Sequence, residues 1–189
     1  MLRLYQQGGP DMLKIRNAEI QDAKSIYDIW SNGWKYAYKN ILSPAFLEKR
    51  VGPDAVKEKI EKFPAKLEKE KAKGNVFFVL LDDDKIIGFV SGGAPDSPEC
   101  AADGELDMLY IDTNYIGRGI GKLLFQHFAQ EMKQRGKKTF GLMCFSENKS
   151  VGFYKKMGGK ITVERRSGEK FEFTMASFIE FDIDEVLKK

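Results

Sequence analysis

Several chemistries are excluded by residue types that this sequence of 189 residues has in small number. It contains only two cysteines, Cys100 and Cys144, which form no C-x-x-C pair, and a single histidine, His127. Because zinc sites need several Cys and His ligands at short spacings, no familiar zinc motif fits, and we predict no metal site. Two unpaired cysteines also suit a reducing compartment, so we expect a cytoplasmic protein.

Long apolar runs are absent as well. Nowhere does the sequence have the roughly eighteen consecutive apolar residues that a membrane-spanning helix needs, and we predict no membrane partner. The amino-terminal stretch MLRLYQQGGPD has too short an apolar run for a signal peptide. We therefore expect residues 1–12 to be a disordered leader, with Met12 as an alternative start, and residues 13–189 to form a single domain.

No strong charge of one sign is present either. The formal net charge is +3, and the segment from Lys57 to Lys73, with seven lysines against four glutamates, carries an excess of that size by itself. A solvated helix face explains this segment, although a nucleic-acid-binding surface is the alternative. We predict no nucleic-acid partner.

The most informative stretch of the chain reads ELDMLYIDTNYIGRGIGKLLFQHFAQEMKQR, over residues 105–135. It predicts a strand, a glycine-rich turn and a helix. By strand alternation, Glu105 and Asp107 should share one face with Leu109 and Ile111. The opposite face should carry Leu106, Met108 and Tyr110.

The glycine-rich turn predicts an anion site. Gly117, Gly119 and Gly121 keep side chains small where the helix begins and its amides have no partner. A Walker loop is excluded because Ile116 and Leu123 replace its first glycine and its Ser or Thr. A Rossmann fingerprint that starts at Gly117 fails because residue 122 is lysine.

What remains is the pattern [QR]-x-x-G-x-[GA] after an apolar strand, which resembles the acetyl-CoA-binding core of the GNAT superfamily of N-acetyltransferases. Ile116 stands where the family usually has Gln or Arg, so backbone amides would supply most of the pyrophosphate binding. The resemblance implies acetyl-CoA as co-substrate. It places cofactor contacts at Leu109, Tyr110, Ile111, Ile116, Gly117, Arg118, Gly119, Ile120, Gly121 and Lys122.

A second segment, residues 147–159, resembles the superfamily's second signature, N-x-x-[AS]-x-x-F-Y-x-K-x-G. Ser150, Phe153, Tyr154, Lys156 and Gly158 stand in register with it. The family asparagine aligns with Glu147, one residue before Asn148. By resemblance, Asn148 and Lys156 are further candidates for cofactor binding.

The fold class that follows is α/β, a GNAT-like mixed sheet of about six or seven strands flanked by helices. We expect antiparallel strands at the amino-terminal side and a parallel βαβ unit at the acetyl-CoA site. Asn17 is the expected cap of the first helix, and Pro64 should divide or kink a helical segment over residues 53–73. The other expected strands cover residues 13–16, 76–81, 85–91, 138–145, 160–166 and 171–183.

The acceptor site is expected beside the first helix. Trp34, Tyr38 and Ile41 match a W-x-x-x-Y-x-x-I segment that borders the acceptor in many superfamily members, although core packing explains Trp34 and Tyr38 equally well. We take Trp34, Tyr38 and Asp107 as candidates for substrate binding. The weakly patterned region over residues 34–73 does not identify the amine.

Acetyl transfer to an amine needs a base, because an amine of pKa about 10.4 is almost fully protonated at pH 7. By resemblance the base is Glu105, with Asp107 as runner-up; binding of the acceptor's cationic group by Glu105 is the alternative. The backbone N–H of Leu109 or its neighbour would stabilise the oxyanion. Tyr154 holds the family's general-acid position and would protonate the leaving thiolate.

The leading hypothesis is therefore an N-acetyltransferase that acts directly on a primary amine of a small molecule or peptide. Covalent catalysis by Cys144 is the competing route, but Cys144 and His127 both lie in apolar segments typical of a core. A catalytically silent acyl-CoA-binding or sensor module of the same fold is the alternative function. Two copies could also pair as a homodimer through the exposed edge of the closing hairpin.

Overall fold

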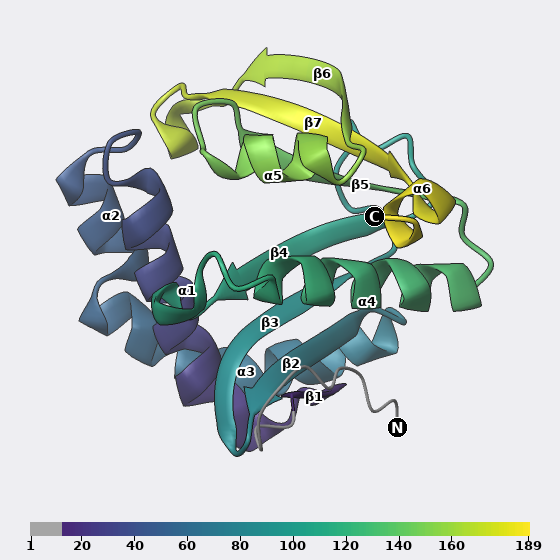
Figure 1. The fold of residues 1–189 in the computed structure, drawn as a ribbon. Helices are drawn as coiled ribbons and strands as arrows, with labels where there is room; N and C mark the ends of the chain where they lie inside the picture. Colours follow the sequence, from purple (N-terminus) through teal and green to yellow (C-terminus); the bar gives the residue numbers. More distant parts are fainter. Residues whose placement is uncertain (1–12) are drawn as a thin grey trace.

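A seven-stranded mixed sheet organises the protein, as a computed structural model that describes residues 13–189 shows (Figure 1). The expected leader over residues 1–12 lies outside the described residues. The strands, in the order β1-β2-β3-β4-β5-β7-β6 across the sheet, are β1 (Leu13–Asn17), β2 (Val76–Asp82), β3 (Lys85–Gly93), β4 (Glu105–Ile111), β5 (Thr139–Phe145), β6 (Lys160–Arg166) and β7 (Met175–Asp182). The sheet and its pairing confirm the predicted fold class.

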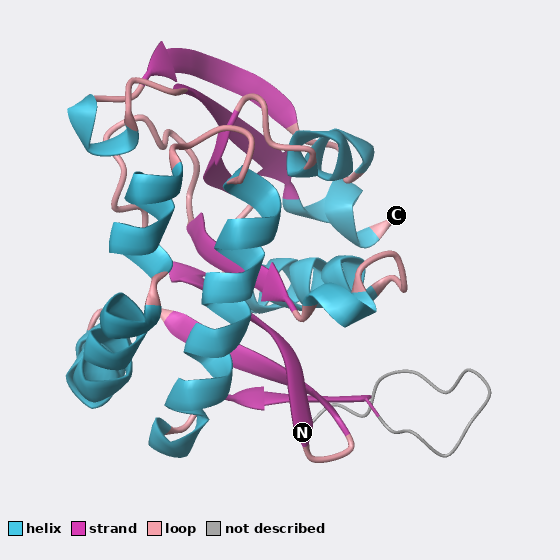
Figure 2. Ribbon diagram, turned by 90° about the vertical axis from the view of Figure 1, so that its left-hand side faces the viewer, coloured by secondary structure: helices cyan, strands magenta, loops and turns pink. Residues whose placement is uncertain are grey.

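Helices cover both faces of the sheet (Figures 1 and 2). They are α1 (Ala23–Tyr38), α2 (Pro44–Val51), α3 (Pro53–Ala72), α4 (Ile120–Gln134), α5 (Ser150–Lys156) and α6 (Ile183–Leu187). One apolar cluster joins α4, α5 and α6 to the sheet, and a second joins α1, α2 and α3 to the opposite face. The two clusters account for the core, since apolar stripes on the helices are buried against the two faces of the strands.

Strand directions match the prediction. Strands β1 to β4 are antiparallel neighbours, whereas β4 and β5, which are joined through α4, are parallel. A short link imposes the antiparallel pairing of β2 with β3. Strands β1 and β2 are antiparallel as well, although α1, α2 and α3 lie between them in the chain. The hairpin of β2 and β3 around residues 82–84 is confirmed too.

The predicted faces of β4 were correct for residues 108–111 and wrong for Leu106. A register shift between Ser91 and Gly92 of β3 leaves Asp107 as an extra residue on β4, opposite no partner of its own. Leu106, which precedes this bulge, packs in the same cluster as Leu109 and Ile111, whereas Met108 packs with Tyr110 in the other cluster. A bulge inserts one residue and so reverses the alternation beyond it.

The first helix begins differently from the prediction. Asn17 belongs to β1, and Glu19 instead caps a short 3-10 turn over Ile20–Asp22 that leads into α1. Asp22 is 4% exposed and accepts two hydrogen bonds from Arg16 at 2.6 and 2.8 Å and one from the Glu19 N–H at 2.8 Å. This ion pair ties the start of α1 to the edge strand.

Two further segments depart from the sequence-based expectation. Pro64 lies inside one continuous helix, α3, and a separate helix, α2, precedes it. The closing hairpin has a longer connection than expected, because Glu169–Phe171 form a 3-10 turn and β7 starts only at Met175. Strand β6 is exposed along its whole length at one edge of the sheet, where the proposed pairing of two copies stays a prediction.

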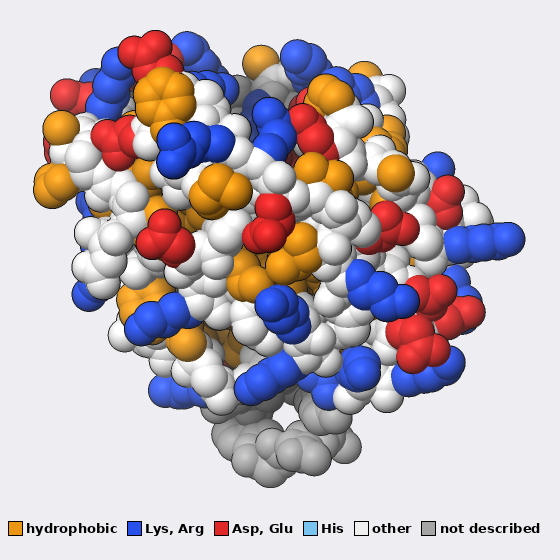
Figure 3. All heavy atoms as spheres, turned by 90° about the horizontal axis from the view of Figure 1, so that it is seen from above, with side chains coloured by type: hydrophobic (Ala, Val, Ile, Leu, Met, Phe, Trp, Pro, Cys, Tyr) orange, Lys and Arg blue, Asp and Glu red, His pale blue; other side chains and the backbone are white. Residues whose placement is uncertain are grey.

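The surface mixes both signs of charge. On the face shown in Figure 3, acidic and basic side chains are interspersed among apolar ones. Over residues 13–189, none of the helices has the length and apolar character to cross a membrane.

The Arg16–Asp22 pair generates a stability prediction. Burial alone would raise the pKa of Asp22, but the hydrogen bonds from Arg16 and the Glu19 N–H outweigh it and lower the pKa from 3.8. Asp22→Asn should therefore lower the free energy of unfolding at pH 7 by about 1–3 kcal/mol, measured by urea denaturation.

The pH dependence has a defined sign. The folded protein stabilises the carboxylate form of Asp22. The difference in free energy of unfolding between the parent and Asp22→Asn should therefore be complete above the ordinary pKa of Asp and should disappear as pH falls through the lowered pKa of the folded state. Asp28→Asn, which removes an exposed ion pair with Lys24, is the matched control and should cost no more than about 0.5 kcal/mol. Equal costs for the two variants would contradict this account.

Candidate functional site

The glycine-rich loop after β4 presents free backbone donors. Gly117 and Gly119 have φ angles of +84° and +81°, which favour glycine, and Gly119 is the residue before α4. Within the described residues, the N–H groups of residues 119–122 donate to no backbone or side-chain acceptor, and the first bond of the helix runs from the Leu123 N–H to the Gly119 oxygen at 3.1 Å. The loop therefore has the geometry of an anion site.

The loop is open around two of its glycines. A Cβ atom at Gly117 or Gly119 would meet nothing within 4 Å. Gly121 packs closely instead, since a Cβ there would lie 3.0 Å from Ile111. Ile120 points into the core, whereas Ile116 is 45% exposed.

Two candidate cations lie on the loop and the first turn of α4, and a third lies on α5. The Arg118 guanidinium lies 5.1 Å from the Tyr115 ring centre, and Lys122 donates to an oxygen of Lys189, the last residue of the sequence, at 2.6 Å. Lys156 is exposed on α5. Among residues 13–189, Arg118 and Lys156 form no salt bridge with an Asp or Glu side chain.

Beside the loop, β4 and β5 separate. The two strands pair only at Glu105 and Gly141, whereas β3 and β4 pair along most of their length. The Asp112 N–H donates to Ile87 at 2.8 Å, so alternation along β4 directs the Leu109 and Ile111 amides away from β3. These amides face the opening between the two strands.

A cleft of about 630 Å³ lies on the α1–α3 side of this opening. It is bounded by α1, α2, α3, β4, the end of β5 and the turn before β7. Its lining residues are Tyr27, Trp30, Trp34, Tyr38, Arg50, Glu58, Lys59, Lys62, Lys66, Asp107, Met108, Tyr110, Met143, Cys144, Phe145 and Phe171. All three residues predicted to bind substrate, Trp34, Tyr38 and Asp107, are brought together here.

Aromatic side chains form one wall of the cleft. Ring centres of Trp34 and Tyr38 are 4.6 Å apart, and those of Tyr38 and Phe145 are 5.3 Å apart. Gly33 lets α1 approach β4 at this point, because a Cβ there would lie only 2.6 Å from the Tyr110 ring. Close packing of α1 on β4 thus fixes the position of the wall.

Tyr154 lies on the opposite side of the opening. It is 9% exposed and packs against Phe125, Phe153 and Phe181, with ring centres 5.3 to 6.2 Å apart. Burial raises its pKa, and the nearby Cys144 adds to the rise. The hydroxyl therefore stays protonated at neutral pH and remains available as a hydrogen-bond donor.

The two candidate bases are placed differently. The Glu105 carboxylate accepts hydrogen bonds from the Asp96 and Ser97 N–H groups at 2.8 and 2.9 Å and from the Ser97 hydroxyl, and it does not line the cleft. Asp107 lines the cleft with an exposed side chain, and desolvation by the surrounding protein raises the pKa of its carboxyl against the opposing effect of Lys66. The base assignment stays a prediction, and this geometry favours Asp107.

Asn148 has a local structural contact. It is 6% exposed, and its Oδ1 accepts from the Ser150 N–H at 2.9 Å, which orients the start of α5. Its predicted role in cofactor binding is left to experiment.

His127 and Cys144 are packed as the sequence indicated. The His127 ring lies edge-on to Phe78 at 4.7 Å, and burial lowers its pKa. Burial raises the pKa of Cys144 to about 12. Neither residue is activated as a nucleophile at neutral pH.

The sequence analysis missed several cations in the cleft. Lys59, Lys62 and Lys66 belong to the segment interpreted as a solvated face, but they line the cleft with Arg50. Ser43 caps α2 through a 3.1 Å bond from the Phe46 N–H, and Pro44 follows it. This Ser-Pro start is a helix signal that could have predicted α2 and drawn attention to Arg50 at its end.

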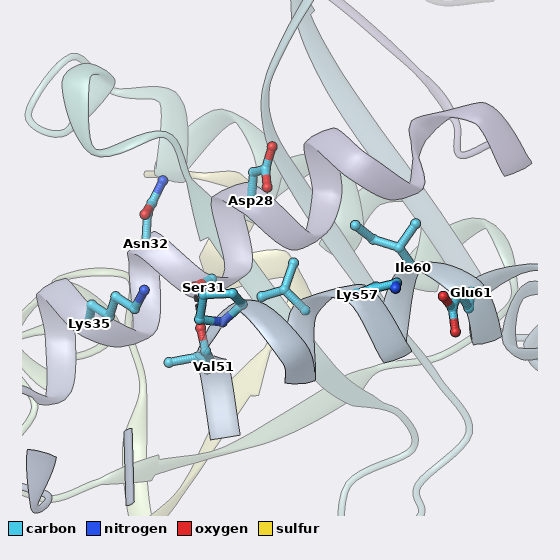
Figure 4. A pocket seen from close by; sticks show the side chains of 10 residues that line it. Asp28, Ser31, Asn32, Lys35, Val51, Lys57, Ile60 and Glu61 are labelled. Carbon is cyan, nitrogen blue, oxygen red and sulfur yellow. Dashed lines mark hydrogen bonds between the residues drawn. The ribbon is translucent and has the colours of Figure 1, made fainter. Parts of the chain in front are cut away.

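A second cavity of about 630 Å³ lies on the outer side of α1 (Figure 4). Its lining residues come only from α1, α2 and α3, and include Asp28, Asn32 and Lys57. It receives no residue from β4 or the glycine-rich loop, so it has no access to the chemistry above. Across residues 13–189, no three His, Cys, Asp or Glu side chains form a metal-binding group.

Two curated proteins are similar to this chain in sequence. A spermidine N(1)-acetyltransferase of Thermoplasma acidophilum is 29% identical over 164 residues, which cover 84% of this chain and 94% of that protein. An uncharacterized N-acetyltransferase of Bacillus subtilis, YuaI, is 25% identical over 161 residues, which cover 85% of this chain and 86% of that protein.

Solved structures share the fold. The PaiA N-acetyltransferase of Thermoplasma acidophilum in complex with coenzyme A matches with a TM-score of 0.70 at 22% identity, over 90% of this chain and 98% of that one. YncA, a putative acetyltransferase of Salmonella typhimurium with its cofactor acetyl-CoA, matches with a TM-score of 0.64 at 18% identity, over 92% and 95%.

The sequence model described as the acetyltransferase (GNAT) family matches residues 34–159. The matched segment runs from the aromatic wall of the cleft, through β4 and the glycine-rich loop, to the end of α5. It covers more than half of the chain, and the chain belongs to the GNAT family of acetyltransferases.

Proposed function

We propose that this acetyltransferase transfers the acetyl group of acetyl-CoA directly to a primary amine of a small molecule or peptide. One observation carries the proposal: β4 leads into a loop with free amides at residues 119–122, lies apart from β5 beyond its pairing at Glu105, and has Asp107 in the lining of the cleft. A pyrophosphate, a pantetheine chain and an amine would each find its complementary group along this one strand.

The comparisons support both substrates. Fold relatives are named as complexes with coenzyme A and acetyl-CoA, and one sequence relative is named for spermidine, a small amine. In this chain, the amides of residues 119–122 would bind the pyrophosphate, with Arg118 and Lys122 adding charge. The Leu109 and Ile111 backbone groups would pair with the pantetheine amides as a further strand does.

The reaction then proceeds by direct attack. A protonated amine of pKa about 10.4 costs roughly 4–5 kcal/mol to neutralise at pH 7, so a base must take its proton. Asp107 accepts that proton, directly or through water, while the nitrogen attacks the acetyl carbonyl carbon. The Leu109 N–H stabilises the oxyanion, the C–S bond breaks, and Tyr154 gives its proton to the departing sulfur.

Burial of Cys144 supports the direct route over an acetyl-enzyme. A thiol whose pKa is about 12 is almost entirely protonated at pH 7, and burial is the sole cause of this shift. Without a nearby cation to offset burial, Cys144 is a poor nucleophile.

Coenzyme A binding tests the glycine-rich loop. Gly119→Glu should weaken binding roughly 10- to 100-fold, measured by calorimetric titration, because the carboxylate would repel the pyrophosphate. Gly74→Glu is the matched control, since Gly74 also has a positive φ, +77°, and a Cβ atom there would likewise meet nothing within 4 Å. The control should lose similar stability and keep the parent's affinity; loss of affinity in both variants would count against the loop.

Asp107→Asn and Glu105→Gln separate the two candidate bases. Asp107→Asn should lower kcat about 100- to 10,000-fold and leave coenzyme A binding intact. Glu105→Gln should have a much smaller effect, because its carboxylate is held by the Asp96 and Ser97 donors. The reverse order of effects would assign the base to Glu105.

The pH profile supplies an independent readout of the base. Because burial raises the pKa of Asp107, parent activity should fall as pH drops through a value above the ordinary 3.8. The Asp107→Asn variant should not show this fall in activity at low pH. If the fall persists unchanged in the variant, Asp107 is excluded as the titrating group.

Tyr154→Phe tests the acid. The thiolate is a moderate leaving group, with a thiol pKa near 8.5, so turnover should slow roughly 10- to 100-fold rather than stop. Phenylalanine keeps the packing against Phe125 and Phe181, so thermal stability should stay close to that of the parent. Coenzyme A binding without turnover of any amine by the parent would instead support a silent acyl-CoA-binding module.

A further inference from the structure

The cleft is positively charged around its aromatic wall. Its lining has four cations, Arg50, Lys59, Lys62 and Lys66, and two acids, Glu58 and Asp107. Lys62 and Glu58 form an ion pair with each other on α3. Three cations then face a single carboxylate, that of Asp107.

Arg50 is the most confined of these cations. Its guanidinium lies 4.8 Å from the Trp34 ring centre and 5.4 Å from that of Phe171. Within the described part of the chain, it forms no salt bridge, and its Nε is buried with no hydrogen-bond partner. Burial lowers the pKa of Arg50, yet a guanidinium is so strongly basic that it remains charged at neutral pH.

A half-buried guanidinium without an anion is an unfavourable arrangement by itself. A desolvated donor on a charged group costs free energy until it is paired, and a planar guanidinium pairs best with a carboxylate or phosphate. Stacking on two aromatic rings orders the Arg50 guanidinium in advance. Binding of an anion therefore costs less side-chain entropy than it would for a freely rotating arginine. The cleft is therefore prepared for an anion that the chain does not itself supply.

Lys59 reinforces this preference. Its Nζ lies 4.9 Å from the Trp30 ring centre, and its pKa is lowered first by burial and next by the charge of Arg50. Two cations close enough to affect each other's titration would both be stabilised by one anion between them.

We propose that the acceptor amine also carries an oxyanion, a carboxylate or a phosphate, which Arg50 binds with help from Lys59. The proposal rests on the function proposed above and narrows its substrate class to amino acids and other anionic amines. In this arrangement the aromatic wall contacts the body of the acceptor, and its amine points to Asp107 and the opening beside β4.

The same charges disfavour a polyamine. A second ammonium in the cleft would meet Arg50, Lys59 and Lys66, and Glu58 is already paired with Lys62. Spermidine is the acceptor in the name of the Thermoplasma relative, at 29% identity. The inferred acceptor of this chain thus differs from that compound in the sign of its second charge.

A panel of matched amines tests the proposal. Each set keeps the carbon skeleton similar and changes the group far from the reacting amine. One set is γ-aminobutyrate, its carboxamide and putrescine, and the others are amino acids with their carboxamides and the amines that remain after decarboxylation. Aminoalkyl phosphates of equal length distinguish phosphate from carboxylate. The parent enzyme should show kcat/KM on the order of 10- to 100-fold higher for the oxyanion member than for its carboxamide.

Variants at position 50 assign the preference. Arg50→Gln should abolish the preference for the oxyanion member, and Arg50→Lys should retain part of it. Arg50→Glu should make the diamine the preferred acceptor. Lys49→Gln, an exposed neighbour on α2 outside the cleft, is the matched control and should keep the parent's preference. Coenzyme A titration of every variant reports whether the protein is folded and cofactor-competent.

The outcomes separate the two proposals. Absence of turnover of every amine in the panel, with or without coenzyme A binding, would overturn the proposed function. Turnover with a preference for diamines or carboxamides, or turnover of those members alone, would overturn the anionic acceptor alone. An unchanged preference in Arg50→Gln would do the same.

Discussion

The site depends on backbone N–H groups of β4 that have no hydrogen-bond partner on a neighbouring strand. Beyond the single pairing of Glu105 with Gly141, β4 turns its Leu109 and Ile111 amides toward a strand that has moved away. An unpaired strand edge and an unpaired helix start would each be costly if buried, so both lie where a ligand or water can reach them. Because backbone groups make these contacts, side-chain departures such as Ile116 are tolerated.

Aromatic side chains pack on both faces of the sheet beside the separation of β4 and β5. On one face Tyr154 lies among Phe125, Phe153 and Phe181; on the other, Trp34, Tyr38 and Phe145 form the wall of the cleft. Strand β5 keeps its full ladder with β7, so the separation costs it only one side of its pairing. The opening is therefore a stable feature of the core rather than a local defect.

The sequence was sufficient where the structure is set by local rules. Alternating and helical periodicity predicted the strands and α4, and the glycines at 117 and 119 occupy the left-handed backbone conformation that their positions require.

The sequence was insufficient where one inserted residue changes the register of a strand. The bulge at Asp107 moves that side chain into the cleft with Met108 and Tyr110, and no periodicity argument reveals a bulge. Arg50 was missed because its role comes from the packing of α2 against rings distant in sequence.

The charge of the cleft also bears on proton transfer. Cations near an amine stabilise its neutral form, so Lys66 and Arg50 would lower the pKa of a bound acceptor and reduce the free energy that Asp107 must supply. Burial acts on Asp107 in the useful direction at the same time, since a carboxyl of raised pKa holds a proton more readily. An oxyanion on the acceptor would offset the repulsion that this positive field otherwise imposes on an incoming ammonium. Anion binding and amine deprotonation are thus two consequences of one distribution of charge, and an acceptor with both groups makes use of each.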